Sequence, residues 1–262
     1  MTKATGGAQS IRRAVAILRV LATGQERGVR LADVVAVCGL NRPTVHRILK
    51  VLSEEGAVEQ DPATRRYLVG REVSLLGLAR GTRSPVRAVA EPYLSHLAEQ
   101  IGDTVFLTVR SGADSIGVDR KMGHYPVQVR ALDIGARRPL GVGVAGVMLL
   151  ACLQEDEAAD LVRANAQRLA RYQLTPARLM ERVRTARNKG YAYADVGIVK
   201  GTSAIAVPVF GPERTALAAI SVAAISDRLP PARASAVAAQ MRAQADLVTR
   251  RLTQMNRVRF AP

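Results

Sequence analysis

The chain has 262 residues, which is room for one small and one medium domain that each bury a core. Its net charge of +16 suits a polyanionic partner, but 13 basic and 7 acidic residues up to Gly81, with 25 and 15 beyond it, spread that charge over both parts. No charge-free stretch is long enough to span a membrane, and Cys38 and Cys152 have neither zinc-site spacing nor a disulfide framework, so we expect a cytoplasmic protein with two structural thiols.

The first expected element is a helix over SIRRAVAILRVLA. Four apolar residues form one stripe along it: Ile11, Ala14, Val15 and Leu18. The stripe fits a dimer contact and fits equally well the covering of the helix's own domain.

Residues 31–69 predict two helices followed by a hairpin. A short helix over about Leu31–Val37 leads through a turn at Gly39 into a longer helix over about Arg42–Glu55. The segments AVEQ and RYLV then flank a turn in which Pro62 suits the first position. This order predicts a winged helix-turn-helix, a DNA-reading module.

The second of these helices carries its own boundary signals. Asn41 suits the N-cap, Pro43 the first turn and Gly56 the C-terminal end. The inward face carries Val45, Ile48, Leu49 and Leu52. The residues that we expect at DNA are Arg42, Pro43, Thr44, His46, Arg47 and Lys50.

Two basic residues at the hairpin tip, Arg65 and Arg66, are placed to contact phosphate. A charged helix face is usually only solvated, but cap, apolar stripe, cationic face and basic hairpin tip occur together in one short span, which favours DNA contact. For His46 both base contact and packing within the domain stay open.

The second half of the chain alternates strands and helices. Strands are expected at TVFLTVR, SIGVDRK and VQVRAL, and a new helix opens near Val86 after a helix that ends at Gly81 and a turn at TRSP. Further helices are expected at about Ala145–Leu153, Glu155–Ala170 and Thr175–Lys189, followed by two long strands and a final helix. This order predicts an α+β fold and not a doubly wound sheet.

The segment GVGVAG, residues 141–146, matches the dinucleotide-binding fingerprint. Its context does not match, because RRP precedes it and two helices follow where a second parallel strand is needed. The glycines still permit close approach to a ligand and leave free amides at a helix N-terminus, which suits an anion. The alternative is that they only allow tight packing of a turn.

Five segments in order resemble the IclR (isocitrate lyase regulator) family of bacterial transcription factors over nearly the whole chain. They are SIRRAVAILRVLA, RPTVHRILKVLSEEGAVEQDPATRRYLVG, RRPLGVGVAGVMLLACL, NKGYAYADVGIVKGTSAIAVPVF and ALAAISVAAISDRL. The resemblance implies a DNA-binding domain at 1–69, a linker helix and turn at 70–84, and an effector-binding and oligomerisation domain with a curved antiparallel sheet at 85–262.

By the same resemblance, the effector pocket lies between the glycine loop, the segment after Gly190 and the last two strands. The residues expected there are Gly141, Val142, Gly143, Val144, Ala145, Met148, Asp195, Ser203, Ala204, Ser221 and Ala223. Alanines stand at two positions where many members have polar side chains, and the acidic run of the family is reduced to Asp195. We therefore expect an organic acid with an apolar or aromatic body, its anionic end held by loop amides and Ser203 or Ser221.

The sequence thus predicts a sequence-specific transcriptional regulator controlled by a small-molecule effector. The expected partners are double-stranded DNA with an inverted-repeat operator, the effector, and a second copy in a homodimer or homotetramer, without a membrane. Scattered histidines and the absence of catalytic motifs predict no enzyme, cofactor or metal. Two alternatives remain: a nicotinamide-dependent enzyme fused to a DNA-binding head, and an architectural DNA binder without an effector.

Overall fold

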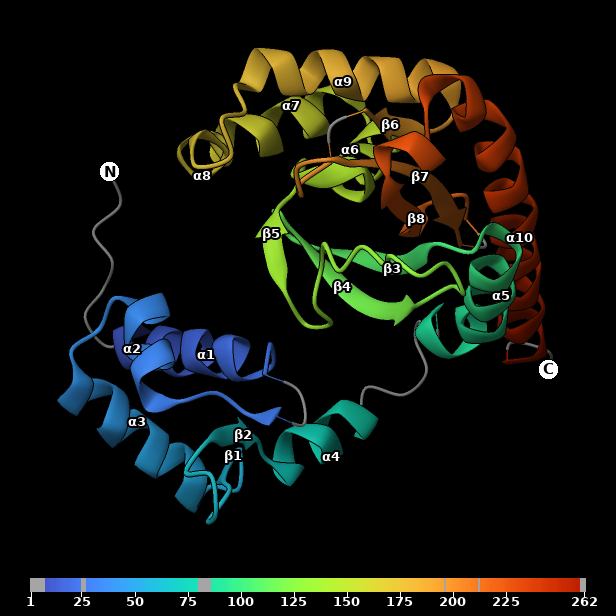
Figure 1. Cartoon of the computed structure of the whole chain (residues 1–262). Helices are drawn as coiled ribbons and strands as arrows, with labels where there is room; N and C mark the ends of the chain where they lie inside the picture. Colours follow the sequence, from blue (N-terminus) through green and yellow to red (C-terminus); the bar gives the residue numbers. More distant parts are fainter. Residues whose placement is uncertain (1–7, 25–26, 80–85, 196, 212, 260–262) are drawn as a thin grey trace. The chain divides into compact units, whose positions relative to one another are not determined.

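The chain forms two compact units, Met1–Arg83 and Ser84–Pro262, each with its own hydrophobic core (Figure 1). The computed structural model describes residues 8–24, 27–79, 86–195, 197–211 and 213–259. The helix end expected at Gly81 and the turn expected at 82–85 lie outside the described residues.

The N-terminal unit has the helix-helix-helix-hairpin order expected of a winged helix-turn-helix. Its described elements are α1 (Gln9–Leu21), α2 (Leu31–Cys38), α3 (Arg42–Glu54), β1 (Val58–Gln60), β2 (Tyr67–Val69) and α4 (Arg71–Ala79). Strands β1 and β2 are antiparallel, with Val58 opposite Val69. The helices expected at 31–37 and 42–55 are confirmed to within one residue.

Helix α3 begins and ends where its local sequence predicts. The side chain of Asn41 accepts a hydrogen bond from the Thr44 amide at 2.9 Å, and Pro43 occupies the first turn. At the other end Gly56 has φ +66°, and the two backbone hydrogen bonds of a Schellman motif close the helix at 3.1 and 2.8 Å. These boundaries fix which α3 residues face outward.

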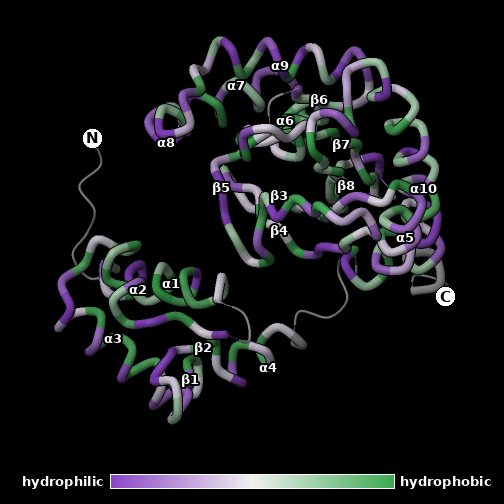
Figure 2. The backbone as a smooth tube through the Cα atoms, viewed as in Figure 1, coloured by the Kyte–Doolittle hydropathy of each residue, from purple (hydrophilic) through white to green (hydrophobic). Residues whose placement is uncertain are grey.

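The N-terminal core gathers one apolar face from each element. It consists of Ile17, Leu21, Val29, Val34, Val45, Leu49, Val58 and Tyr67. Figure 2 shows hydrophobic and hydrophilic segments alternating along α3, as a half-buried helix requires. The predicted stripe is confirmed, with Val45 and Leu49 fully buried and Ile48 and Leu52 half-buried against them.

The C-terminal unit is an α+β domain built on one six-stranded antiparallel sheet of order β5-β4-β3-β8-β7-β6. Its first described elements are α5 (Val86–Ile101), β3 (Thr104–Ser111), β4 (Asp114–Lys121), β5 (Arg137–Pro139), α6 (Gly143–Ala151), α7 (Glu155–Ala164) and α8 (Ala166–Ala170). They are followed by α9 (Pro176–Lys189), β6 (Ala192–Ala194), β7 (Thr202–Phe210), β8 (Ala216–Ile225), the short η3 (Ser226–Arg228) and α10 (Pro231–Arg259).

Helices cover both faces of this sheet (Figure 1). Helices α5 and α10 pack on one face, where Leu107 and Val207 are fully buried. Helices α6, α7 and α9 pack on the other, where the sheet presents small residues such as Ala206 and Ala219. The pocket described below opens on this second face.

Two of the expected elements are wrong. The segment VQVRAL, residues 127–132, is a loop, because β5 occupies the open edge of β4 with Arg137 opposite Ile116. The helix expected over Glu155–Ala170 is broken into α7 and α8 at Asn165, a buried residue whose side chain donates a hydrogen bond to the Ala113 carbonyl at 2.7 Å.

The antiparallel sheet also makes the dinucleotide-fold reading of residues 141–146 wrong, since that fold needs parallel strands on either side of the glycine turn. Within the described residues, no helix is long and apolar enough to cross a membrane.

Candidate functional site

The outward face of α3 is exposed and cationic. His46, Arg47 and Lys50 are exposed, as is Pro43, whereas Thr44 is half-buried. Lys50 lies 3.9 Å from Glu54 in a solvated ion pair, which is weak enough to open when a phosphate or base approaches. The face therefore offers free guanidinium and imidazole donors close to the helix N-terminus.

The two arginines at the hairpin tip differ in exposure and in hydrogen bonding. Arg65 is exposed in a left-handed turn position with φ +57°. Arg66 is half-buried, and its Nη1 donates a hydrogen bond to the Gly28 carbonyl at 3.2 Å. Arg66 therefore ties the hairpin to the chain before α2, so that Arg65 is the freer of the two for a phosphate.

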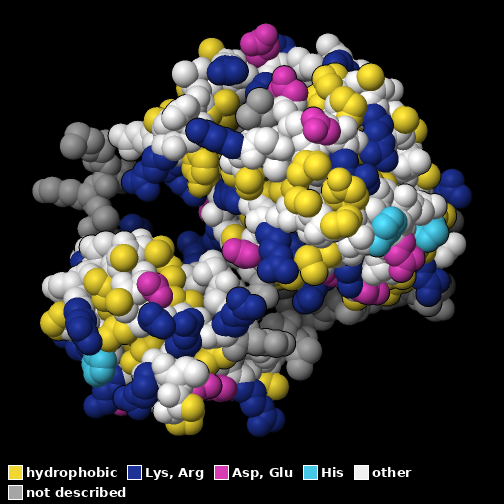
Figure 3. All heavy atoms as spheres, in the orientation of Figure 1, with side chains coloured by type: hydrophobic (Ala, Val, Ile, Leu, Met, Phe, Trp, Pro, Cys, Tyr) yellow, Lys and Arg dark blue, Asp and Glu magenta, His cyan; other side chains and the backbone are white. Residues whose placement is uncertain are grey.

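Basic side chains are not confined to this unit. Figure 3 shows Lys and Arg spread over the visible face of both units. Bulk charge therefore does not single out one surface of the chain.

A pocket of about 450 Å³ opens on the α6–α9 side of the C-terminal sheet. Phe106 of β3 and its paired neighbour Ser221 of β8 lie in its floor, and the loop at 131–132, the N-terminus of α6, the α8–α9 turn and the segment 194–202 line it. The volume lies in the ordinary range for small-molecule sites, about 300–1,000 Å³.

The pocket contains most, but not all, of the residues expected for an effector. Those that line it are Val142, Gly143, Val144, Ala145, Ala204, Ser221 and Ala223. Gly141, Met148, Asp195 and Ser203 are not among the lining residues. Ser203 instead donates its hydroxyl to the Asp195 carbonyl at 3.0 Å, and Met148 is buried in the α6 core.

Three arginines in the pocket lining were missed by the sequence analysis: Arg138, Arg171 and Arg182. Burial lowers the pKa of the Arg138 guanidinium, whereas Tyr172 and Asp133 raise it. Burial and Arg178 lower the pKa of Arg182, whereas Asp195 raises it. Arginine stays charged in proteins, so both shifts mean that a guanidinium has given up hydration.

The glycine loop serves both packing and the pocket. Gly141 has φ +102°, and a Cβ there would lie 2.4 Å from a methyl of Leu179. Gly143 begins α6 with φ +76° and lines the pocket, and Val142 before it provides no side-chain cap. The first amides of α6 are thus free of a capping side chain and lie at the pocket.

Thr108 in β3 is the polar group without a partner at this site. Its side chain lines the pocket, the residue is 2% exposed, and its Oγ1 has no hydrogen-bond partner among the described residues. An unsatisfied buried hydroxyl costs about 1–3 kcal/mol, so the Thr108 hydroxyl destabilises the unliganded protein.

Replacing Thr108 by valine is expected to stabilise the unliganded protein by about 1 kcal/mol, because valine has nearly the same shape and no hydroxyl to leave unpaired. Thr104 is a matched control on the same strand, since it is also buried but donates its hydroxyl to Gln128 Oε1 at 2.8 Å. Thr104→Val should destabilise the protein by about 1 kcal/mol. Urea denaturation of both variants measures the two effects; shifts of the same sign would contradict this reading of Thr108.

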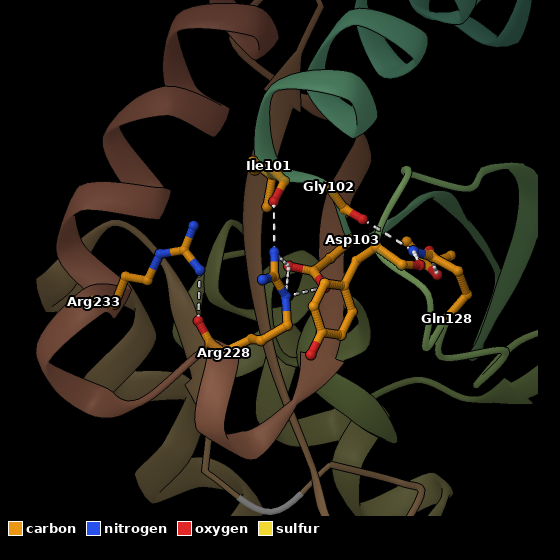
Figure 4. Close-up of polar contacts among 8 residues, drawn as sticks. Ile101, Gly102, Asp103, Gln128, Arg228 and Arg233 are labelled. Carbon is orange, nitrogen blue, oxygen red and sulfur yellow. Dashed lines mark hydrogen bonds and ion pairs between the residues drawn. The ribbon is translucent and has the colours of Figure 1, made fainter.

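One wall of the pocket is anchored by a buried polar network at the start of β3 (Figure 4). Gln128 donates to the carbonyls of Gly102 and Tyr125 at 2.9 and 2.6 Å. Arg228 donates to both carboxylate oxygens of Asp103 at 2.9–3.1 Å, and its guanidinium lies 3.9 Å from the Tyr125 ring centroid. These contacts hold the loop that continues to the pocket wall at 131–132.

Neither cysteine is set up for redox chemistry. Burial raises the pKa of Cys38, and raises that of Cys152 to about 11 against the opposing charge of Arg187. Both therefore remain protonated and weakly nucleophilic near neutral pH. Among the described residues, no cluster of histidine, cysteine and acidic side chains could hold a metal ion.

A helix-turn-helix with an exposed cationic helix, joined in one chain to an α+β unit with a ligand-sized pocket, defines a ligand-responsive transcriptional regulator. The family model described as "Bacterial transcriptional regulator IclR C-terminal" matches residues 80–250, and the IclR helix-turn-helix domain matches residues 10–62. The chain belongs to the IclR family.

Relatives and solved structures agree with this assignment. The glycerol operon regulatory protein of Streptomyces coelicolor is 33% identical over 225 residues, covering 84% of this chain and 86% of the relative. The transcriptional repressor IclR of Escherichia coli is 26% identical over 250 residues, covering 94% and 90%. These relatives are regulators, and the chain is a DNA-binding regulator with an effector-binding C-terminal domain, not an enzyme.

Two solved structures share the fold. An IclR transcriptional regulator from a Silicibacter species is 25% identical with a TM-score of 0.74, covering 93% of this chain and 96% of that one. An IclR homolog from Microbacterium hydrocarbonoxydans complexed with 4-hydroxybenzoate is 20% identical with a TM-score of 0.71, covering 93% and 99%.

Proposed function

We propose that this cytoplasmic regulator binds an inverted-repeat operator as a homodimer through the exposed face of α3, and that an organic acid with an apolar or aromatic body controls this binding. The observation that carries the effector class is the pocket itself, which combines arginines with an apolar floor. Phe106, Ala204 and Ala223 supply that floor, and Val129 of the adjoining loop packs against it. The 4-hydroxybenzoate bound by the Microbacterium homolog supports an aromatic acid.

The apolar stripe of α1 supports dimerisation. Ile11 is 67% exposed and Val15 is 40% exposed, so the domain's own core does not cover this part of the stripe. Leu75 and Leu76 of α4 are also exposed. Exposed apolar residues of this kind are favoured at contacts between copies. Light scattering coupled to gel filtration distinguishes monomer, dimer and tetramer.

Control by the effector would be a thermodynamic linkage between the effector pocket and the DNA-binding surface. If the effector-bound dimer favours one spacing of its two α3 helices, DNA that fits only the other spacing must weaken effector binding by the same factor. The reciprocal change can be measured by titrating the effector with and without operator DNA.

The first experiment is selection of genomic DNA fragments by the purified protein at physiological salt, followed by calorimetry with aromatic acids and short polar oxoacids. We expect enrichment of an inverted repeat and tighter binding of the aromatic acids. Tight binding of short oxoacids alone would contradict the effector class, and DNA affinity that no small molecule alters would favour an architectural DNA binder.

Replacing Arg47 by alanine is expected to weaken operator binding by about 1–3 kcal/mol while changing random-DNA binding much less, because a bidentate arginine discriminates between bases. Arg250→Ala, an exposed position on α10, removes the same charge from the other unit and is the control. Fluorescence anisotropy with both DNAs measures the effect. Equal losses on operator and random DNA would make Arg47 a phosphate contact instead.

A further inference from the structure

The charged side chains that line the pocket are all cationic. Arg138, Arg171 and Arg182 contribute to the lining, and no aspartate or glutamate does. Arg138 belongs to β5 and Arg182 to α9, so the two half-buried guanidiniums reach the pocket from different elements.

At the first cationic position, Arg138 has no ion-pair partner within 4 Å among the described residues. Asp133 is the nearby acid that acts on its charge, but Asp133 is already paired with Arg120 at 3.4 Å. Among the described residues, the Arg138 side chain donates only to the Ala131 carbonyl, and Tyr172 of the α8–α9 turn acts on its charge. Arg138, Arg120 and Asp133 therefore form a group of two cations and one acid.

The charges around Arg182 also include more cations than acids. Arg182 lies beside Arg178 of the same helix and Asp195, again two cations for one acid. Asp195 follows β6, which is one edge strand of the sheet, whereas Arg138 lies in β5, the opposite edge strand. Arg182 lies on α9, which packs against β6. The two arginines therefore approach the pocket from opposite edges of the sheet.

Several apolar residues line the pocket between the two arginines, among them Phe106, Ala204 and Ala223. Ser221 and Thr108 also line it, and the buried hydroxyl of Thr108 has no partner among the described residues. The uncapped amides at the start of α6 add further donors for an anion. An anion paired with each of these guanidiniums would compensate their removal from water.

We propose that the effector is a compact dicarboxylate, with one carboxylate bound at Arg138 and the other at Arg182 and a short apolar or aromatic frame between them over Thr108. This rests on the proposed function, since it names the ligand class of the same pocket. The sequence analysis expected one carboxylate, held by loop amides and a serine. The dicarboxylate proposed here has a second carboxylate, which pairs with the second arginine.

The test is calorimetry on the full-length protein with matched pairs of acids: isophthalate and terephthalate against benzoate, and adipate against hexanoate. At least one dicarboxylate should bind about tenfold or more tightly than the monocarboxylate of its frame. Arg138→Gln and Arg182→Gln should each reduce this ratio to near one, with little change for the monocarboxylate. Arg184→Gln, an exposed α9 position outside the pocket lining, should keep the ratio of the unmodified protein.

Several outcomes would overturn the proposal. Monocarboxylates that bind as tightly as their dicarboxylates and release DNA would overturn the dicarboxylate inference while leaving the organic-acid regulator intact. A ratio that survives in both glutamine variants would remove the two arginines from recognition. If no acid of either kind binds, the effector class and the inference both fail. The ratio in the unmodified protein is decisive even if a glutamine variant does not fold, and Arg138→Lys and Arg182→Lys retain the charge for a second measurement.

Discussion

Replacing Asp103 by alanine is expected to lower the free energy of unfolding of the C-terminal unit by about 3 kcal/mol, the lower end of the range for breaking one side of a buried ion pair. Asp103 is 2% exposed and accepts three hydrogen bonds from Arg228, which is 25% exposed. Without Asp103 the Arg228 guanidinium keeps the Ile101 carbonyl and the Tyr125 ring but has no anion. Partial access to water limits the loss.

The size of this effect is measured by hydrogen exchange resolved along the chain, because the two units need not unfold together. The double variant Asp103→Ala/Arg228→Met should recover most of the lost stability, since removing both charges leaves neither unpaired. A loss below about 1 kcal/mol in Asp103→Ala would show that the pair acts as a surface salt bridge.

The substitution Asp103→Ala should also affect the effector pocket. Asp103 and Gly102 lie where α5 passes into β3, and Gln128 joins that junction to the loop before the pocket wall. We therefore expect Asp103→Ala to weaken effector binding as well as stability, although Asp103 is not among the residues that line the pocket. Gln128 is the residue through which the two effects are coupled.

The N-terminal unit could be predicted almost entirely from the sequence, because its signals are local. The Asn41 cap, the Gly56 end and the apolar stripe of α3 each act within one or two turns of the chain. The sequence did not indicate the hydrogen bond from Arg66 to the Gly28 carbonyl, which joins residues 38 positions apart. No local pattern reports a contact of that range.

In the C-terminal unit, the features that the sequence did not predict depend on contacts between segments far apart in the chain. The segment 127–132 alternates like a strand, but whether it pairs depends on which segment occupies the edge of β4, and β5 takes that place. No local pattern distinguishes Arg138 and Arg182 from the other arginines of the chain. The fold brings them to one pocket from β5 and from α9. Thr108 was likewise hidden in a strand-like run whose two faces the sequence alone does not tell apart.

Replacing Leu49 by alanine is expected to cost the N-terminal unit about 2–5 kcal/mol, the usual range for a leucine deleted from a packed core. Leu49 is fully buried on α3 and packs in a core of eight buried residues. A unit of this size has a total stability of only about 4–12 kcal/mol, so the loss is a large fraction of what keeps α3 in place. The DNA-reading face should therefore be lost first, while the C-terminal unit, with its separate core, keeps its effector affinity.

Anisotropy with operator DNA and calorimetry with the effector, performed on the same preparation, separate the two consequences of Leu49→Ala. Val51→Ala is the control, because Val51 lies on the same helix but is 51% exposed and should change stability by about 0.5 kcal/mol or less. If Leu49→Ala reduced effector affinity as strongly as DNA affinity, the two units would have to share stability through contacts beyond their separate cores. Loss of DNA binding alone would mean that the N-terminal unit folds on its own core.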